Sequence, residues 1–593
     1  MSRDVSLHWL DYAIFGLSIG LSLSTGVYHA IKSRIILRRG DRTAKEEYLM
    51  GGRQLPPLPV ALSLLTTFLS GILMLGVPAE MFQRGAQIWL NFVIGVASSI
   101  VTCFVFLPVF HKMKSTCLHE YFIHRYNSIL IRRLFSLLFL LFTIVYMSVV
   151  LYAPSVALSP VLQINKWYLV LIFGCTTTLY TCLGGLKAVV WTDSLQAVIM
   201  YTGVFTLIYK GLSHPRVGGL ERVMSIAWDS GRISELGRMD WRIDQYNSLW
   251  INLFSGTIVW LASFGVNQLA IQRYASLPNL KVAQSIIVYT LAPFTVLCSI
   301  VAFVGFIALA YFYNCNPLET GEIKQSDHIT IIFARDILQP TPGLFGLYVS
   351  CIMSATLSTL SSGMNSMAAA IYEDFLKNKL DGKITDTGAT RLNKLIVLIC
   401  GLTSTGLAFL AEVLGGSLRI CISVMGAMSG PMVAIFVLAL FFPKSGSKSC
   451  LISFFLSNLF CLIICIANYI QDPYQDLFLP TNTTMEGCNQ SSNFTIRMMP
   501  TYDAHYGNPD TLFISRISTY SYAGVGFVLM MVIGYITSLF EESNHKEEKI
   551  RHLTFAGRKY VSFFRCSFPI SYFFSEPWPD THHEYDHFLK EIK

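Results

Sequence analysis

Charged side chains are scarce in this chain of 593 residues: Asp, Glu, Lys and Arg supply only 13% of it, whereas hydrophobic residues supply 53%. The mean hydropathy is +0.51. A soluble protein of this length needs a largely polar surface, so this composition excludes a soluble globular protein. It indicates an all-α protein that crosses a lipid bilayer several times.

Signatures of several other functions are also missing. No basic patch is interleaved with aromatic residues, which argues against nucleic-acid binding. The 14 cysteines show no C-x-x-C pair and no Cys/His spacing typical of a metal site, so we expect no cofactor and no metal ion other than Na⁺. We recognise no nucleophile–base pair and no phosphate-binding glycine loop, and we therefore expect no enzyme. The first apolar run lacks the flanks of a signal peptide and should remain as a membrane helix.

Long apolar runs are what the chain has in abundance, and thirteen of them can span a bilayer. Their approximate ranges are 9–31, 56–77, 87–110, 134–158, 166–185, 188–211, 249–270, 283–313, 343–371, 392–414, 418–442, 448–470 and 518–540. Basic residues gather in the short loops at 32–53, 112–133, 377–394 and 444–448, which the positive-inside rule assigns to the cytoplasm. With thirteen crossings, the N-terminus is then expected outside and the C-terminus inside.

The loop at 471–517 supports this orientation. It is predicted outside and holds three N-x-[ST] sequons, at Asn482, Asn489 and Asn493, which are candidate glycosylation sites. Cys315 and Cys488 are the two cysteines in predicted outside loops. They can form a disulfide or stay free, and the sequence leaves both alternatives open.

A stripe of small polar residues runs along the apolar stretch Ser350–Phe375. Ser354, Ser358 and Asn365 fall on one helical face, and Ala355 lies one turn before Thr359. Neutral oxygen atoms suit a hard monovalent cation such as Na⁺. Small hydroxyl residues also let membrane helices pack closely, so the stripe alone fits either interpretation.

Thr66, Thr67, Ser70 and Gly71 interrupt the second apolar segment near its middle. A discontinuous membrane helix at this point would expose backbone carbonyl groups to an ion. The alternative is a packing face of small residues.

Asp193 stands early in the sixth segment, with Gln196 one turn further on. A carboxylate in a membrane helix is costly and often marks an ion path. The alternatives are a cytoplasmic cap or an ion pair with Lys187.

The seventh segment ends in SFGVNQLAIQRY, preceded by Trp260. The amides of Asn267, Gln268 and Gln272, together with Trp260 and Phe264, can line a cavity. Alternatively, the amides cap the helix and shape the following loop.

In combination, these stretches resemble the sodium/solute symporter family, and most closely its branch of sodium–iodide, sodium-coupled monocarboxylate and sodium-dependent multivitamin transporters. The residues that carry the resemblance are SLLTTFLSGILMLGVPAE (63–80), GGLKAVVWTDSLQ (184–196), GVNQLAIQRY (265–274), SATLSTLSSGMNSMAAAIYEDF (354–375) and GPMVAIFVLALFFP (430–443). The resemblance covers roughly residues 8–545.

The resemblance implies a leucine-transporter-like fold built from two inverted five-helix repeats. The expected organisation is a first helix and basic loop at 1–55, repeats at 56–211 and 249–442 separated by an extracellular loop at 212–248, two peripheral helices at 443–540, and a cytoplasmic tail at 541–593. It also implies a main sodium site made by the carbonyls of Thr66, Leu69 and Ala355 and the hydroxyls of Ser358 and Thr359. Asp193 and Gln196 match the ion path toward the inner side.

The same resemblance places Leu73, Trp260, Phe264, Leu418 and Arg419 at the substrate cavity. Leu73 stands where sugar transporters carry a polar contact and the iodide transporter a glutamine, which argues against a sugar, since a lost buried polar contact costs about 1–3 kcal/mol. Relatives commonly carry glutamine at the position of Arg419. Its guanidinium can either snorkel to the outer interface or hold a carboxylate bidentately.

The expected function is secondary active transport in the plasma membrane: Na⁺ flow drives import of a small organic anion, a monocarboxylate above all, by alternating access. The alternatives are symport of iodide, a vitamin carboxylate or another solute of the family, and an uncoupled Na⁺ channel or solute sensor. The expected partners are Na⁺, the solute and the bilayer, and the sequence leaves the oligomeric state open.

Overall fold

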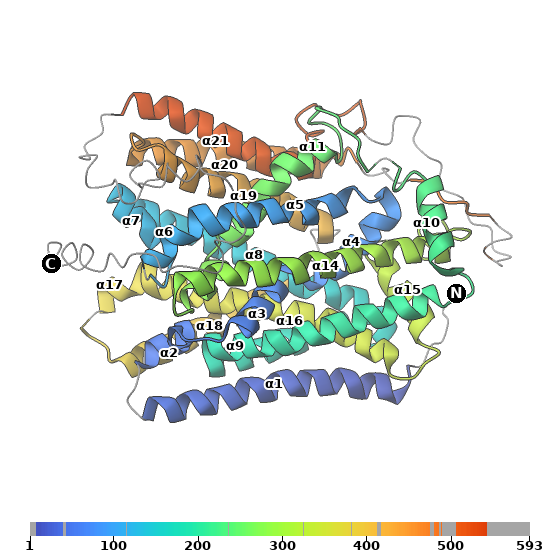
Figure 1. Cartoon of the computed structure of the whole chain (residues 1–593), viewed down its shortest axis with the longest axis horizontal. Coiled ribbons are helices and arrows are strands. Elements are labelled where there is room, and N and C mark those ends of the chain that lie inside the picture. Colours follow the sequence, from blue (N-terminus) through green and yellow to red (C-terminus); the bar gives the residue numbers. More distant parts are fainter. Residues whose placement is uncertain are drawn as a thin grey trace.

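The computed structural model describes residues 7–541, except for 39–42, 114, 235, 324, 381, 412–416, 475–478, 485–487 and 489–505; the side chains of residues 34, 36–38 and 417–421 also lie outside the description. Among the described residues the regular structure is helical, with one isolated bridge between Gln245 and Tyr506. The fold is therefore all-α, as predicted. Figure 1 shows the helices as an elongated bundle with most of their axes roughly along its length.

The helices are α1 (Trp9–Arg38), α2 (Ala44–Met50), α3 (Pro57–Phe68), α4 (Gly71–Arg84), α5 (Gln87–Val101), α6 (Leu107–Lys112), α7 (Glu120–Tyr126), α8 (Ile129–Leu162), α9 (Lys166–Leu212), α10 (Gly219–Asp229), α11 (Leu249–Ile251), α12 (Thr257–Trp260), α13 (Gln268–Ala275), α14 (Leu280–Phe312), α15 (His328–Leu338), α16 (Leu344–Ile371), α17 (Lys377–Leu380), α18 (Asp386–Ala408), α19 (Ser417–Phe441), α20 (Ser447–Gln471) and α21 (Tyr522–Leu539). π-helical turns at Thr102–Phe106, Asn252–Gly256, Leu261–Gly265 and Tyr372–Leu376 extend or join several of them.

Ten of these helical spans are long and apolar enough to cross a membrane, and two bent pairs bring the number to twelve. The bent pairs are α3 with α4, at 58°, and Leu249–Gly265 with α13, at 44°. The predicted thirteenth crossing depends on α9, because the sequence divides this element into two segments.

Helix α9 has 47 residues and would reach about 70 Å if it were straight, but both of its ends lie near the start of α1. Tyr12 of α1 donates a hydrogen bond to Leu162, just before α9, and Lys210 near the end of α9 donates to Thr341. The nearby Gly343 amide donates to Asp11 of α1 at 3.1 Å. The element therefore folds back on itself, in agreement with two segments.

The reversal in α9 lies at Gly185, the one residue inside the element with non-helical angles (φ 60°, ψ −158°). A Cβ atom here would collide with the backbone carbonyl of Tyr48, and positive φ strains any other residue. Gly185 thus meets two requirements that only glycine satisfies.

Among the ten long apolar spans, the one that contains α16 is the most enclosed: 89% of an 18-residue stretch is buried, against 28% for α1 and 33% for α20. Figure 1 shows α16 inside the bundle, with α1 along one edge and α20 and α21 along the opposite edge. The outer helices expose large apolar side chains such as Leu17 and Ile470, which suits contact with lipid. The polar stripe of α16 is therefore at the core of the molecule.

Three of the loops predicted to be extracellular are linked to one another. Cys315 and Cys488 form a disulfide with their Cα atoms 5.0 Å apart. Arg232, in the 212–248 loop, is buried and donates to the carbonyl groups of Leu479 and Pro480 at 2.9 and 3.1 Å. Burial lowers the pKa of Arg232 to about 10, against the opposite effect of Tyr313 and Glu319, and backbone carbonyls accept hydrogen bonds from its guanidinium.

Candidate functional site

The break between α3 and α4 is where the sequence predicts a discontinuous helix. Helix α3 ends at Phe68, Leu69 leaves helical geometry with φ −98° and ψ 87°, and α4 starts at Gly71. The Ser70 hydroxyl caps α4 by accepting from the Leu73 amide at 3.5 Å. Gly71 has no side chain, and a Cβ there would collide with Thr356 of α16. The predicted interruption is confirmed, and the glycine lets the break approach α16.

The hydroxyls of α16 meet the carbonyls at this break. The Ser358 hydroxyl lies 3.0 Å from the Thr66 carbonyl and 3.1 Å from that of Ala355. The Thr359 hydroxyl lies 3.1 Å from the same Ala355 carbonyl and 3.2 Å from the Thr67 carbonyl. All of these residues are almost completely buried. The structure thus brings together four of the five sequence-predicted residues and adds Thr67; Leu69 supplies the break itself.

This group of oxygens is neutral and faces the termini of two short helices. The carbonyl end of α3 carries the negative end of its helix dipole, and the amide end of α4 carries the positive one. Carbonyl and hydroxyl oxygens without a fixed carboxylate can hold a monovalent cation, whereas a divalent ion of the hard type prefers carboxylates.

A second buried cluster surrounds Asp193 on α9. Its carboxylate accepts from the hydroxyl of Ser63 on α3 at 2.5 Å and pairs with Arg273 of α13 at 3.2 Å. Ser361 and Ser362 of α16 each lie 3.4 Å from a carboxylate oxygen. Four helices therefore converge on one acid, and neither Asp193 nor Arg273 is exposed.

The alternative predicted from the sequence, an ion pair between Asp193 and Lys187, is wrong. Lys187 instead pairs with Glu47 of α2 at 3.0 Å. Arg273 was not recognised as the partner because it is 80 positions from Asp193 in the chain. Gln196 is also buried, but its amide donates to Ser22 of α1 at 3.2 Å, so it connects α9 with α1.

Trp260 and Phe264 are part of a buried aromatic cluster beside the break. Their rings stack at 5.6 Å, Phe264 contacts Phe68 at 4.9 Å, and both contact Phe294. The Trp260 indole donates to the backbone and side-chain oxygens of Asn91, both at 2.8 Å. Phe68 is the last residue of α3, so this cluster adjoins the group of oxygens at α16.

The amides after Trp260 and Phe264 bond the backbone and side chains of neighbouring elements, which favours the alternative to a cavity lining. Asn267 caps α13 by accepting from the Leu269 amide at 2.9 Å. Gln268 bonds the backbone of Thr116 and Leu118, and Gln272 bonds Leu49 and Ser366. They cap the helix and hold the neighbouring loops, which was the alternative interpretation.

Leu73 is partly buried and packs against the apolar cluster of Ile72, Val149, Val150 and Ala153. The side chains of Leu418 and Arg419, both predicted at the substrate cavity, lie outside the described residues. Asn482 is exposed, and the other two sequons, Asn489 and Asn493, lie outside the described residues.

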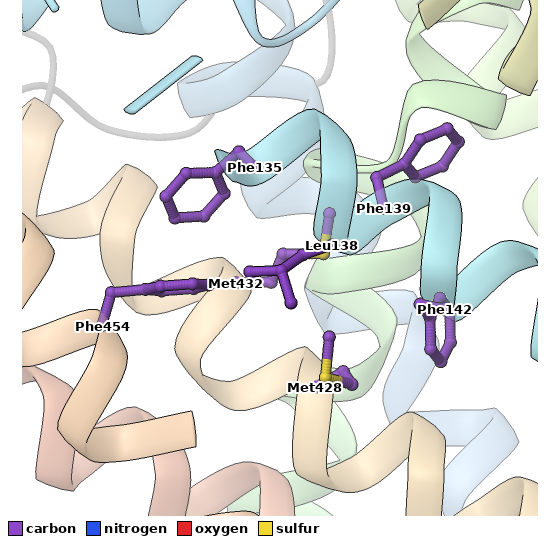
Figure 2. A pocket seen from close by; sticks show the side chains of 7 residues that line it. All are labelled: Phe135, Leu138, Phe139, Phe142, Met428, Met432 and Phe454. Carbon is purple, nitrogen blue, oxygen red and sulfur yellow. The ribbon is translucent and has the colours of Figure 1, made fainter. Parts of the chain in front are cut away.

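A small apolar hollow of about 10 Å³ lies between α8 and the helices α19 and α20. Figure 2 shows its seven lining side chains, all of them apolar: Phe135, Leu138, Phe139, Phe142, Met428, Met432 and Phe454. None of these side chains offers a hydrogen bond to a carboxylate or an oxygen to Na⁺. The hollow is therefore separate from the group of oxygens and the aromatic cluster.

Comparison with solved structures places the fold. A structure described as a substrate-bound outward-open state of a Na⁺-coupled sialic acid symporter superimposes with a TM-score of 0.72, covering 91% of this chain and 99% of that one at 19% identity. With the two bent helix pairs, this likeness shows a leucine-transporter-like fold.

The family profile described as the Sodium:solute symporter family matches residues 48–456. Sodium-coupled monocarboxylate transporter 2 of Mus musculus is 33% identical over 530 residues, which cover 89% of this chain and 83% of the relative. Sodium-dependent multivitamin transporter of Oryctolagus cuniculus is 32% identical over 535 residues, with coverages of 89% and 82%. The chain belongs to the Sodium:solute symporter family, and it is a Na⁺-coupled solute symporter of the membrane rather than an enzyme.

Proposed function

We propose that this symporter uses the Na⁺ gradient across the plasma membrane to import a small organic anion, with monocarboxylates as the main class. The observation that carries the proposal is the meeting of the Ser358 hydroxyl and the Thr66 carbonyl, 3.0 Å apart, at a helix break in the core of the molecule. The names of the monocarboxylate-transporting relatives support the choice of solute.

The proposed sodium site is formed by the carbonyls of Thr66, Leu69 and Ala355 and the hydroxyls of Ser358 and Thr359. Each hydroxyl hydrogen that now points at a carbonyl would rotate away and leave a lone pair for the ion. Na⁺ would then connect the end of α3 to α16. Bound Na⁺ would thereby stabilise the arrangement in which the two elements touch.

The proposed anion site is on the other side of the same break. Half-helix amino termini attract anionic groups in transporters of this kind, and only Leu69 and Ser70 separate the amide end of α4 from the carbonyl end of α3. Phe68, Phe264 and Trp260 supply an apolar wall for a short hydrocarbon chain, and Leu73 lies on the first turn of α4. A site with one positive helix end and apolar walls favours a small carboxylate over a polyhydroxylated sugar.

Alternating access needs a contact that opens when Na⁺ leaves, and the Asp193 cluster is our candidate. In the proposed organisation, Ser63 and Asp193 belong to the first repeat (56–211), and Arg273 and Ser362 to the second (249–442). The two bent pairs begin these repeats at equivalent positions, which supports the division. Na⁺ released from the site would pass Asp193 toward the cytoplasm, with Gln196 alongside.

The test is a solute panel in oocytes: lactate, pyruvate, butyrate, nicotinate, biotin, pantothenate, iodide and glucose, each with and without Na⁺, with current and tracer recorded together. We expect concentrative, Na⁺-dependent uptake of lactate, pyruvate or butyrate. Uptake confined to biotin and pantothenate would instead favour the alternative suggested by the multivitamin relative. Na⁺ current without accumulation of any solute would contradict symport.

A further inference from the structure

Cys117, His119 and Asp374 form a buried cluster that the transport mechanism does not use. The first two lie in the loop between α6 and α7, and Asp374 lies in the π-helical turn that continues α16. The Cys117 sulfur and the His119 Nδ1 atom are each 3.1 Å from the Asp374 Oδ2 atom, and 3.4 Å from one another. None of the three side chains reaches solvent to more than a few per cent.

The three atoms have the identity and the spacing of zinc ligands. Thiolate, imidazole and carboxylate are the groups that bind Zn²⁺, at about 2.0–2.3 Å. An ion equidistant from the three atoms in their plane would be about 1.9 Å from each; a displacement of about 1 Å out of the plane gives the usual lengths. The Ser136 hydroxyl lies 2.9 Å from the same Nδ1 atom and donates to the Asp374 Oδ2 atom, so it contacts two of the three ligands.

The surroundings hold the ligands in place. Arg132 of α8 donates to the other Asp374 oxygen, Oδ1, at 2.5 Å, which fixes the carboxylate and leaves Oδ2 for the cluster. Phe139 of α8 packs on the His119 ring at 5.7 Å. The His119 Nδ1 atom is the ring nitrogen that faces the other two ligands, while Nε2 is buried and without a hydrogen-bond partner among the described residues. Ser115 and Thr116, just before Cys117, are partly exposed and give an ion a short path from the surface.

We propose that Cys117, His119 and Asp374 form a Zn²⁺-binding site that fastens the α6–α7 loop to the end of α16. Binding exchanges the thiol proton for the metal: the S–H bond breaks, an S–Zn bond forms, and the proton goes to solvent without any redox change. This revises the expectation that Na⁺ is the only metal ion. The sequence pattern did not reveal the site because its third ligand is 255 positions from His119.

Zn²⁺ bound at this site would inhibit transport, and this consequence rests on the proposed function. Helix α16 carries Ser358 and Thr359, and alternating access requires it to move relative to the first repeat. Zn²⁺ bound across the cluster would link the two and hold one conformation. Zn²⁺ applied to the cytoplasmic face of excised patches is therefore expected to reduce the Na⁺-coupled current.

The test is metal binding to the purified full-length protein, which is independent of transport. We expect the protein to bind one Zn²⁺ per chain in competition with a chromophoric chelator. When Co²⁺ replaces Zn²⁺, we expect a thiolate-to-metal charge-transfer band. Cys117→Ser should abolish the band, and His119→Gln should weaken Zn²⁺ binding at least tenfold. Cys175→Ser is the matched control, because Cys175 is an exposed free thiol on α9, and it should keep both signals.

Size-exclusion and thermal unfolding profiles show whether each variant is folded. If the Cys117→Ser variant does not fold, His119→Gln provides a second measurement. Absence of stoichiometric Zn²⁺ binding, a Co²⁺ spectrum without the thiolate band, or unchanged binding in either folded variant would overturn the proposal. If no solute in the panel is transported with Na⁺, only the proposed inhibition of transport is refuted, and the Zn²⁺-binding result is unaffected.

Discussion

Replacing Ser358 with alanine tests the sodium site most simply. The change removes one hydroxyl oxygen that lies 3.0 Å from the Thr66 carbonyl and 3.1 Å from the Ala355 carbonyl, and leaves the helix backbone as it is. A polar contact to a charged partner contributes about 1.5–3 kcal/mol, and 1.4 kcal/mol is a tenfold change in affinity. We therefore expect the half-saturating Na⁺ concentration to rise by about ten- to a hundredfold.

The assay is two-electrode voltage clamp at a saturating carboxylate concentration, with surface expression measured by biotinylation. Ser350→Ala is the matched control, since Ser350 is buried in the same helix and its hydroxyl, among the described residues, donates to the carbonyl of Gly346 in its own helix. That variant should keep the wild-type Na⁺ dependence. An unchanged Na⁺ dependence in Ser358→Ala, at normal expression, would refute the assignment of this hydroxyl.

Three further predictions follow from the other contacts. Asp193→Leu leaves Arg273 buried and uncompensated and should lower the free energy of unfolding by about 3–5 kcal/mol. Adding Arg273→Met should restore part of the Tm but not transport, and an Asp193→Leu variant as stable as wild type would contradict a stabilising role of the Asp193 cluster. Trp260→Phe loses both hydrogen bonds of the indole and should raise the KM for the carboxylate several-fold at an unchanged Na⁺ dependence. Trp250 is half-exposed on the same segment, and Trp250→Phe should change neither the KM nor the Na⁺ dependence; equal effects of the two variants would argue against a substrate role for Trp260. Cys315→Ser opens a loop of 173 residues and should cost about 2–5 kcal/mol of stability; a Tm that does not fall, with or without reductant, would show that this bridge contributes little.

The helical spans and the break in α3–α4 could be predicted because both are local properties of the chain. Apolar length defines a membrane segment, and the run of hydroxyls and glycine from Thr66 to Gly71 marks the interruption within one segment. The bend before α13 was not predicted, since the amides of Asn267 and Gln268 also suit a cavity. Only their contacts show them to be a cap and a loop anchor.

Pairings between distant residues could not be predicted. Asp193 was recognised as unusual from its own position, but its partner Arg273 depends on how α9 and α13 pack. The same applies to Cys117 and His119, because the carboxylate that they contact, Asp374, lies just after the end of α16. The thirteen crossings, the outside N-terminus and the assignment of the ion ligands stay predictions.

Equilibrium binding of radioactive Na⁺ to the purified protein tests the central claim most directly. If Na⁺ binds between the break at Thr66–Leu69 and α16, the wild-type protein and Ser350→Ala will show saturable binding, and the double variant Ser358→Ala/Thr359→Ala will lose it or bind far more weakly. Wild-type Na⁺ affinity in a folded double variant would contradict the account.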